Sequence, residues 1–474
     1  LARPSTQPTS GVTVNDIVAD PAAGAAAGAV RVIRSVGVVV VNYNGGRMVE
    51  QCVRSLLATD WDTGLEIVVV DNASVDGLLW TLQEHYPQVR VIVSDTNEGF
   101  ARGCNLAMAD LTGVDHVALI NNDAIVEPGW LGPLLEAITP ADVGAVVPKL
   151  LLTVHARAVL LEAEPASTLP DGRAVGVGVT SLEVDGRELL HQARFDERFW
   201  ADERAYRNDI DVKWTKQPIA SAWWAADDSA ASQVTLRLRS LAPTDVRVGD
   251  GRRSHVVRVL PEGVDVELVI DGSLRIINSA GGGLFAGWHG GDRGFLEPDI
   301  GQYQDPVEVF SWCGGAVLLK ADYLRDVGLF DPTFFLYYED FDVSWRGRAR
   351  GWRYVYAPSA VVHHEHAYSS KEGSAFFSFW VDRNRRLTLV KNAPAGVALR
   401  AVGGVFVVAA RDLARHTLSQ ARRRRPPSPR WLRDRSRDLL KVLRGVPHAV
   451  RERRRIARGR TNHDDLAARW MVAK

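Results

Sequence analysis

The stretch "SVGVVVVNYN" (Ser35–Asn44) decides the fold class that the sequence predicts for this chain of 474 residues. Its valines form an almost continuous β-branched run, which is typical of a strand buried on both faces of a sheet. The residues that follow, "RMVEQCVRSLLA" (47–58), have the apolar spacing of a helix. We therefore expect a strand–helix unit near the start of the folded region.

This unit recurs along the chain. "LEIVVVDN" (65–72), "VRVIVSD" (89–95) and "HVALINND" (116–123) have the pattern of further strands, each followed by a helical pattern. Alternating strands and helices predict an α/β fold, in which helices cover both faces of a mostly parallel sheet. Ligands of such sheets bind beyond the carboxyl ends of the strands.

Polar residues lie at these strand ends, namely Asn42, Asn44, Asp71, Asn72, Asn121, Asn122 and Asp123. The Asp71 carboxylate can accept the imide N–H of uracil or thymine, or it can cap a turn in "DNAS". Asp123 can bind a divalent cation, because magnesium sites often combine one or two carboxylates with phosphate oxygens. The sequence therefore points to a nucleotide or metal site at this edge, with ordinary loop roles as the alternative.

The glycine pattern excludes two nucleotide-binding classes. "NYNGGR" (42–47) is not the Gly-x-Gly-x-x-Gly of a nicotinamide dehydrogenase, and the chain has no Gly-x-x-x-x-Gly-Lys-Ser/Thr loop. A bound nucleotide would therefore be held by side chains.

An acidic cluster follows an aromatic run in "FFLYYEDFDVSWRGRARGW" (Phe334–Trp352). Glu339, Asp340 and Asp342 could complement the dipole at the start of a helix, or one of them could accept a proton as a general base. Asp342 lies four residues before Arg346, so we expect a helical salt bridge there.

Three histidines, His363, His364 and His366, follow an apolar strand pattern in "PSAVVHHEH" (358–366). They have the pattern of ordinary histidines at a strand end. One of them could instead join Asp123 in a metal site that is completed by the phosphates of a ligand.

The order of six motifs carries a resemblance to a known family. The motifs are "VVVVNYNGG", "EIVVVDNASVDG", "NEGFARGCN", "LINNDAIVEPGWL", "CGGAVLLKADYLRDVGLFDPTFFLYYEDFDVSWRGRARGW" and "PSAVVHHEH". Together they resemble an inverting family 2 glycosyltransferase of GT-A fold, close to the rhamnosyltransferase and galactofuranosyltransferase branch. The resemblance covers residues 36–152 and 269–392.

The resemblance implies a role for particular residues. Asp340 would be the catalytic base, with Glu339 and Trp312 at the acceptor, although core packing is an equal alternative for Trp312. Asp123 and His364 would bind Mg²⁺ or Mn²⁺, with His363 as the fallback ligand, and Asn121 stands where the family's Asp-x-Asp motif has its first carboxylate. The expected donor-binding residues are Asn42, Asp71, Asn97, Asn105, Asn121 and Asn122.

The resemblance also implies an activity, the transfer of a sugar from a nucleotide-diphosphate donor to a glycan or lipid-linked glycan. dTDP-L-rhamnose is the first expected donor and UDP-galactofuranose the second. A sugar-nucleotide pyrophosphorylase would need an Arg- and Lys-bearing glycine loop, which "NYNGG" lacks. A non-catalytic glycan-binding protein is the more remote alternative.

The remaining segments complete the expected domain organisation. Short alternating strands over 153–268 predict an antiparallel β module inserted between the two halves of the GT-A domain, 35–152 and 269–392. Its "WW" (Trp223, Trp224) has the pattern of core aromatics or of a glycan contact. Residues 1–34, rich in Ala, Gly, Pro and Thr, are expected to be a flexible leader.

The net charge of zero conceals a basic tail over 393–474. Residues 411–460 contain 18 Lys and Arg against 4 Asp and Glu, a local charge of +14. Apolar residues at helical spacing beside arginines predict helices that lie on an anionic membrane surface, and nothing calls for a nucleic acid partner. With three cysteines and no apolar run of 18 residues, we expect a cytoplasmic protein, peripheral at the inner face of the plasma membrane.

Overall fold

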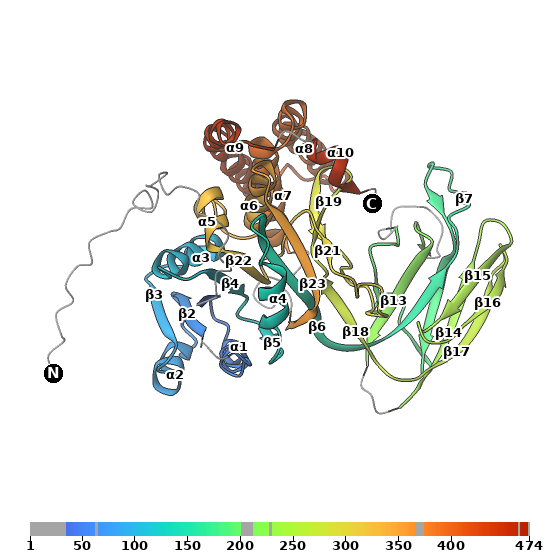
Figure 1. Cartoon of the computed structure of the whole chain (residues 1–474). Coiled ribbons are helices and arrows are strands. Elements are labelled where there is room, and N and C mark those ends of the chain that lie inside the picture. The colour runs from blue at the N-terminus through green and yellow to red at the C-terminus, as the bar shows by residue number, and fades with distance from the viewer. Residues whose placement is uncertain are drawn as a thin grey trace.

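The computed structural model describes residues 35–61, 65–200, 212–226, 230–365, 374–462 and 465–472. The expected leader, 1–34, lies outside the described residues. Figure 1 shows an α/β body, a β-rich module to one side of it and a group of helices above it.

The α/β body is built on the sheet that the valine-rich runs predicted. Its strands β1 (Val36–Asn42), β2 (Leu65–Asn72), β3 (Arg90–Ser94) and β4 (His116–Ile120) are parallel and lie in the order β3-β2-β1-β4. Beyond β4 comes β22 (Ala316–Lys320), which is antiparallel and pairs Ala316 with Ile120. The segment before β22 therefore reaches the edge at which β1, β2 and β4 end, hereafter the rim.

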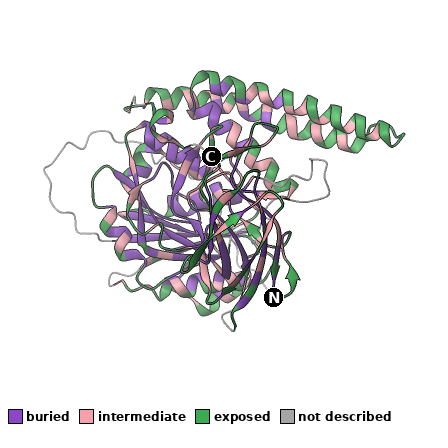
Figure 2. Ribbon diagram, turned by 90° about the vertical axis from the view of Figure 1, so that its right-hand side faces the viewer, coloured by how far each residue is buried: buried purple, intermediate pink, exposed green. Residues whose placement is uncertain are grey.

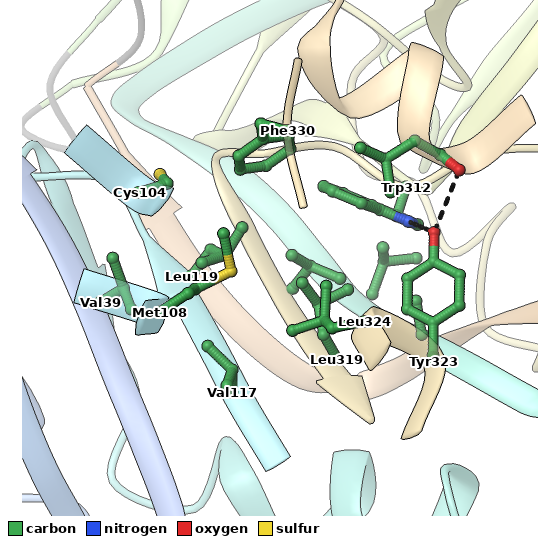
Figure 3. Close-up of a cluster of buried hydrophobic side chains, with 14 of the residues drawn as sticks. Val39, Cys104, Met108, Val117, Leu119, Trp312, Leu319, Tyr323, Leu324 and Phe330 are labelled. Atoms are coloured by element: carbon green, nitrogen blue, oxygen red, sulfur yellow. Dashed lines mark hydrogen bonds between the residues drawn. The ribbon is translucent and has the colours of Figure 1, made fainter. Parts of the chain in front are cut away.

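Helices cover both faces of this sheet, because successive valines point to opposite sides. One core contains Val38 and Val40 with residues of α1 (Arg47–Leu57), α2 (Leu78–His85) and α4 (Leu131–Ala137). The other contains Val39 with residues of α3 (Gly99–Asp110), α5 (Ala321–Val327) and α6 (Glu339–Ala349). Figure 3 shows part of this second core, where Val39 and Cys104 lie on one side and Trp312 and Tyr323 on the other. The predicted fold class is confirmed.

The strand β6 (Val143–Glu162) joins the body to the β module. Its first half pairs with β22 and β23 (Arg353–His364), and its second half pairs with β13 (Ile219–Ala225) and β15 (Thr244–Gly249). The boundary expected between 152 and 153 therefore falls inside one continuous strand. The two ends of the insertion meet, because β18 (Leu274–Ser279) pairs its Leu274 with Ala156 of β6.

The β module has a hydrophobic core of its own, which includes Leu182, Leu236 and Trp224. Trp223 packs in a neighbouring cluster with Ile276, so both tryptophans of "WW" are core residues. The other strands of the module are β7 (Ser167–Thr168), β8 (Ala174–Val175), β9 (Gly178–Val184), β10 (Arg187–Glu188), β11 (Arg194–Phe195), β12 (Lys213–Trp214), β14 (Ser232–Arg239), β16 (Ser254–Val259) and β17 (Val264–Ile270). That the module folds as a separate unit stays a prediction.

Three helices follow the sheet. α7 (Ala375–Asn392) packs against α6, and α8 (Ala395–Arg422) and α9 (Pro429–Arg458) both pack against α7. Figure 2 shows a long pair of helices along the top of the molecule, one end of which extends past the other elements and is mainly exposed. Within the described part of the chain, no helix combines the length and apolarity needed to cross a bilayer.

The end of the described chain returns to the α/β body. α10 (Leu466–Trp470) is followed by β24 (Met471–Val472), which pairs in parallel with β19 (Gly282–Phe285) of the hairpin that β20 (His289–Asp292) completes. The expected basic tail is therefore only partly a tail, because its last residues add a strand to this hairpin. The short strands β5 (Ala124–Val126) and β21 (Val307–Glu308) each pair with β23.

Candidate active site

At the rim, the ends of β1, β2 and β4 are joined by hydrogen bonds between side chains. Asn42 Nδ2 donates to Asp71 Oδ1 at 2.9 Å, and Asn122 Nδ2 donates to Asn42 Oδ1 at 3.1 Å. The parallel strands place these residues together because their carboxyl ends share one edge. Gly45 is needed here, since a Cβ on it would lie 2.5 Å from Asn122 Nδ2 and 2.7 Å from Asn42 Oδ1.

The turn after β2 fixes the second oxygen of Asp71. The Ser74 backbone N–H donates to Asp71 Oδ2 at 3.1 Å, and the Ser74 hydroxyl accepts from Asn42 Nδ2 at 3.1 Å. Asp71 is 3% exposed. It is therefore a rigid acceptor at the strand end, and its contact with a pyrimidine stays a prediction.

Two residues that were expected to bind the donor, Asn97 and Asn105, lie outside this network and form hydrogen bonds with backbone groups. Asn97 Oδ1 accepts from the Gly99 N–H at 2.9 Å, where α3 begins. Asn105 exchanges two hydrogen bonds with the main chain of Phe330, at 2.9 and 3.1 Å, and so ties α3 to the segment before α6. Contact of either residue with a donor stays a prediction.

The expected metal ligands are brought together by β23. His364 pairs with Ala124 in the β5–β23 ladder, which places it beside Asp123. His364 Nε2 lies 3.0 Å from Asp123 Oδ1, and both residues are buried. The fallback ligand His363 points elsewhere, with its Nε2 2.9 Å from Glu127 Oε1.

The surroundings of His364 fit a divalent cation. Its Nδ1 lies 2.6 Å from Asn278 Oδ1, which can only accept, so Nδ1 donates this hydrogen bond, and in the neutral imidazole Nε2 carries the lone pair. That lone pair faces an Asp123 oxygen and the Asn121 amide nitrogen at 3.2 Å. No cluster of three or more His, Cys, Asp or Glu with metal-binding geometry occurs among the described residues. Phosphate oxygens or water would therefore complete the coordination.

The candidate base, Asp340, is fixed by two backbone N–H groups. Gly314 N donates to its Oδ2 at 2.9 Å, and Phe341 N donates to its Oδ1 at 2.7 Å. Burial raises the pKa of Asp340 to about 6 despite these two donors, and the charge of Asp292 on β20 adds to the rise. A carboxylate with this pKa is ionised at neutral pH and is still a useful proton acceptor.

Glu339 differs from its neighbour in protonation. Burial, followed by the charge of Asp340, raises the pKa of Glu339 well above its ordinary value. Adjacent carboxyl groups in such a site lose their protons at different pH values, and Asp340 is the one that ionises first. Glu339, which keeps its proton, could thus donate a hydrogen bond to the acceptor substrate, and this role stays a prediction.

The base and the metal pair lie on either side of one turn. Gly314 contacts Asp340 through its N–H. At the next residue, a Cβ on Gly315 would lie 3.5 Å from His364 Cε1, and the Gly315 carbonyl accepts from Asn121 N at 2.9 Å. Two consecutive residues therefore link the candidate base, His364 and the end of β4.

Trp312 was expected at the acceptor, and the structure contradicts this expectation. It is 2% exposed, belongs to the core that contains Val39 and Tyr323, and donates from Nε1 to the Tyr323 hydroxyl at 3.3 Å (Figure 3). It cannot form a wall for an acceptor, because no face of the ring reaches the surface. Its alternative, core packing, is the one found. The Asp342–Arg346 bridge is confirmed, at 3.1 Å.

Four residues that contribute to the site carried no role in the sequence analysis. Asn278 lies in β18 and Asp292 in β20, and neither belongs to one of the six motifs. Gly314 and Gly315 are part of "CGGAVLLK", so their motif was visible but their contacts were not. A separate cavity of about 660 Å³ lies in the β module beside Phe195, Trp200 and Lys213, and the expected site residues do not line it.

Comparison with known proteins finds the expected family over one part of the chain. Residues 37–154 match the model of the glycosyl transferase family 2, so this stretch is a family 2 glycosyltransferase domain, as its motifs predicted. The chondroitin synthase of Escherichia coli is 33% identical over 96 residues, which are 20% of this chain and 14% of that protein. The chain thus spans about a seventh of this relative.

Two solved structures illustrate more distant likenesses. GalNAc-T7, solved with UDP, GalNAc and Mn²⁺, is 14% identical with a TM-score of 0.38 over 76% of this chain and 48% of that one. The mannosyltransferase PcManGT of Pyrobaculum calidifontis, solved with GDP-Man and Mn²⁺, is 12% identical with a TM-score of 0.37 over 87% of this chain and 86% of that one.

Proposed function

We propose that this protein transfers a sugar from a nucleotide-diphosphate donor to a hydroxyl group of a cell-envelope glycan or glycolipid, with inversion at the anomeric carbon. The observation that carries the proposal is the turn Gly314–Gly315, which contacts both a carboxylate of raised pKa and the histidine of an Asp–His pair. A hydrolase would share the carboxylates but would not need the buried polar network at the ends of β1, β2 and β4.

In this proposal each group of residues performs one task. Asp71 accepts the imide N–H of the nucleotide base, Asn42 holds that carboxylate in place, and Asn122 in turn holds Asn42. Asp340 accepts the proton of the acceptor hydroxyl as that oxygen attacks. A divalent cation held by Asp123 and His364 would supply Lewis-acid stabilisation of the diphosphate leaving group.

The proposed donor is dTDP-L-rhamnose, with UDP-galactofuranose as the second choice. Support comes from the order of the six motifs, which resembles the rhamnosyl and galactofuranosyl branch, and from a carboxylate suited to the imide of thymine or uracil. A thermal-shift screen of dTDP-, UDP- and GDP-sugars with Mn²⁺, followed by transfer assays, tests this choice. Stabilisation by a GDP-sugar alone would exclude the pyrimidine site at Asp71.

We further propose that the far halves of α8 and α9, hereafter the projecting hairpin (residues 406–440), attach the protein to an anionic membrane. The near half of α8 is packed through Val397, Ala401 and Val405, so part of the expected apolar stripe is core. Beyond it, Val407 is 68% and Leu418 62% exposed, and the arginines of 422–437 belong to the same projecting hairpin. Figure 2 shows that this end of the helix pair is mainly exposed. An apolar face beside basic residues suits an acidic bilayer surface.

The hairpin is itself ordered by contacts between its two helices. His416 stacks on Trp431 with ring centres 4.1 Å apart, and Asp412 forms an ion pair with Arg435. α9 then returns to α7, where Val442 and Ala449 are buried and His448 Nε2 lies 2.9 Å from Asp331 Oδ2. Truncation after Pro394 would remove this packing as well, so point variants test membrane attachment more cleanly.

Vesicle flotation tests the attachment. The full chain should float with anionic but not neutral vesicles, and less so at high salt. The variant with Leu413→Glu and Leu418→Glu should remain at the bottom. Val256→Glu with Val269→Glu, which adds the same two negative charges at exposed valines of the β module, is the control and should float like the parent. Failure of the parent to float, or equal flotation of the hairpin variant, would exclude this surface.

A further inference from the structure

The segment that leads into α6 has an unusual backbone. Tyr337 and Tyr338 both have φ of 70°, in the left-handed region that bulky side chains rarely adopt. α6 begins at the next residue, Glu339, and Asp340 follows it. Such a conformation persists only where neighbouring groups hold it.

The side chain of Asn384 on α7 stabilises this conformation. Asn384 is completely buried, and its Nδ2 donates to Leu336 O at 2.9 Å and to Tyr337 O at 2.8 Å. Its Oδ1 accepts from Arg383 Nη1 at 2.6 Å. Both amide hydrogens and the amide oxygen are therefore used, which is a combination that only Asn or Gln can provide.

The same helix also anchors the body of α6. Lys391 Nζ donates to Asp342 Oδ2 at 2.6 Å, and Asn392 Nδ2 donates to Asp342 Oδ1 at 2.9 Å. On the opposite side, the Tyr338 hydroxyl accepts from Gly290 N at 3.3 Å. α6 is thus also held through Asp342, whereas Asn384 acts on the two carbonyl groups directly before the helix.

We propose that Asn384 is a positioning residue for the catalytic base, an inference that rests on the proposed function. By holding the two carbonyls, it fixes the left-handed pair Tyr337–Tyr338 and so the direction in which α6 presents Asp340 to the Gly314 N–H. Loss of this hold loosens the 2.9 Å contact of Asp340 with Gly314. A carboxylate that loses an N–H donor becomes a weaker acid.

The test uses a matched pair of variants in the full chain. Asn384→Leu removes the amide and keeps the number and branching of the side-chain heavy atoms. Thr388→Val, one turn later on the same buried face, removes a hydroxyl that has no hydrogen-bond partner among the described residues. Asn384→Leu should lower kcat by roughly 10–100-fold with an unchanged donor KM, since small displacements of a catalytic group have effects of this order. The acidic limb of its pH profile should move to higher pH, and Thr388→Val should behave like the parent.

A second measurement separates this inference from the proposed function. Hydrogen exchange of the amides in 334–345 should accelerate in Asn384→Leu, or in Asn384→Ala if the leucine variant does not fold, and not in Thr388→Val. A parent protein that transfers no sugar from any donor would refute the proposed function. Parent-like kcat, pH profile and exchange in the Asn384 variants would overturn the role of Asn384.

Discussion

Asp340→Asn is predicted to abolish most of the activity without weakening the fold at neutral pH. The change keeps the shape of the side chain and removes its ability to accept a proton. Turnover should fall by roughly 10²–10⁴-fold, the usual contribution of a general base. Affinity for the nucleotide donor should be unchanged, because Asp71 and Asp123 lie on other elements of the rim.

The effect on stability follows from the environment of Asp340. Its pKa rises from 3.8 to about 6 on folding, which corresponds to about 3 kcal/mol against the ionised form. An acid with a raised pKa in the folded state stabilises the fold while it is protonated, and that contribution is lost as the pH rises from about 4 to about 6. At pH 7.5 the carboxyl group is ionised in the folded and in the unfolded state, so the parent is destabilised by the full cost of burying this charge.

The asparagine variant avoids the cost of ionisation but loses a hydrogen bond. Asn has one acceptor oxygen, so either the Gly314 or the Phe341 N–H loses its partner. An unpaired buried N–H costs about 1–3 kcal/mol. The net expectation at pH 7.5 is a free energy of unfolding that is equal to the parent's or up to about 2 kcal/mol higher, and that becomes lower than the parent's near pH 4.

Urea unfolding at pH 4.5 and 7.5, donor binding by calorimetry and a transfer assay measure these quantities. Asp322→Asn, at an exposed carboxylate on α5, is the control and should change neither activity nor the pH dependence of stability. Near-parental turnover in Asp340→Asn would refute the assignment of the base. A stability difference that did not depend on pH would refute the reasoning about burial.

Two other predictions concern the metal pair and the insertion. His364→Ala should abolish Mn²⁺ binding in the presence of a nucleotide diphosphate, and Asn278→Ala should weaken that binding about 10–100-fold. His155→Ala is the control and should leave Mn²⁺ binding intact. Full activity of the parent in excess chelator would contradict this site. Joining His155 to Arg275, which face each other across β6 and β18, by a short linker should remove the β module without loss of donor binding; a folded deletion protein that no longer binds donor would contradict the boundary.

Much of the catalytic core could be predicted from local pattern. The valine-rich runs gave strands because β-branched side chains suit a sheet covered on both faces, and the alternation with helices gave parallel pairing. Asn42, Asp71 and Asn122 could be placed at one rim for the same reason. Asp340 and His364 needed the motif resemblance, since nothing in their local sequence separates a base or a ligand from a helix-capping acid or a strand-end histidine.

The contacts that complete the site join residues far apart in the sequence. Asp123 and His364 meet because β5 and β23 pair, and Asp340 meets Gly314 because β22 is antiparallel to β4. Asn105 holds Phe330, and Asn384 holds Leu336 and Tyr337, through backbone groups that no side-chain pattern reveals.

The sequence by itself thus determined the fold class, the rim and the helices of the basic tail, because these depend on periodicity and local propensity. Only the tertiary structure decided that Trp312 is buried, that β6 runs unbroken into the insertion and that α9 returns to pack on α7. The physical reason is the same in each case. Burial and strand pairing depend on which surfaces meet after folding, and a tryptophan or an apolar helix face has the same local pattern whether it meets solvent, a ligand or its own core.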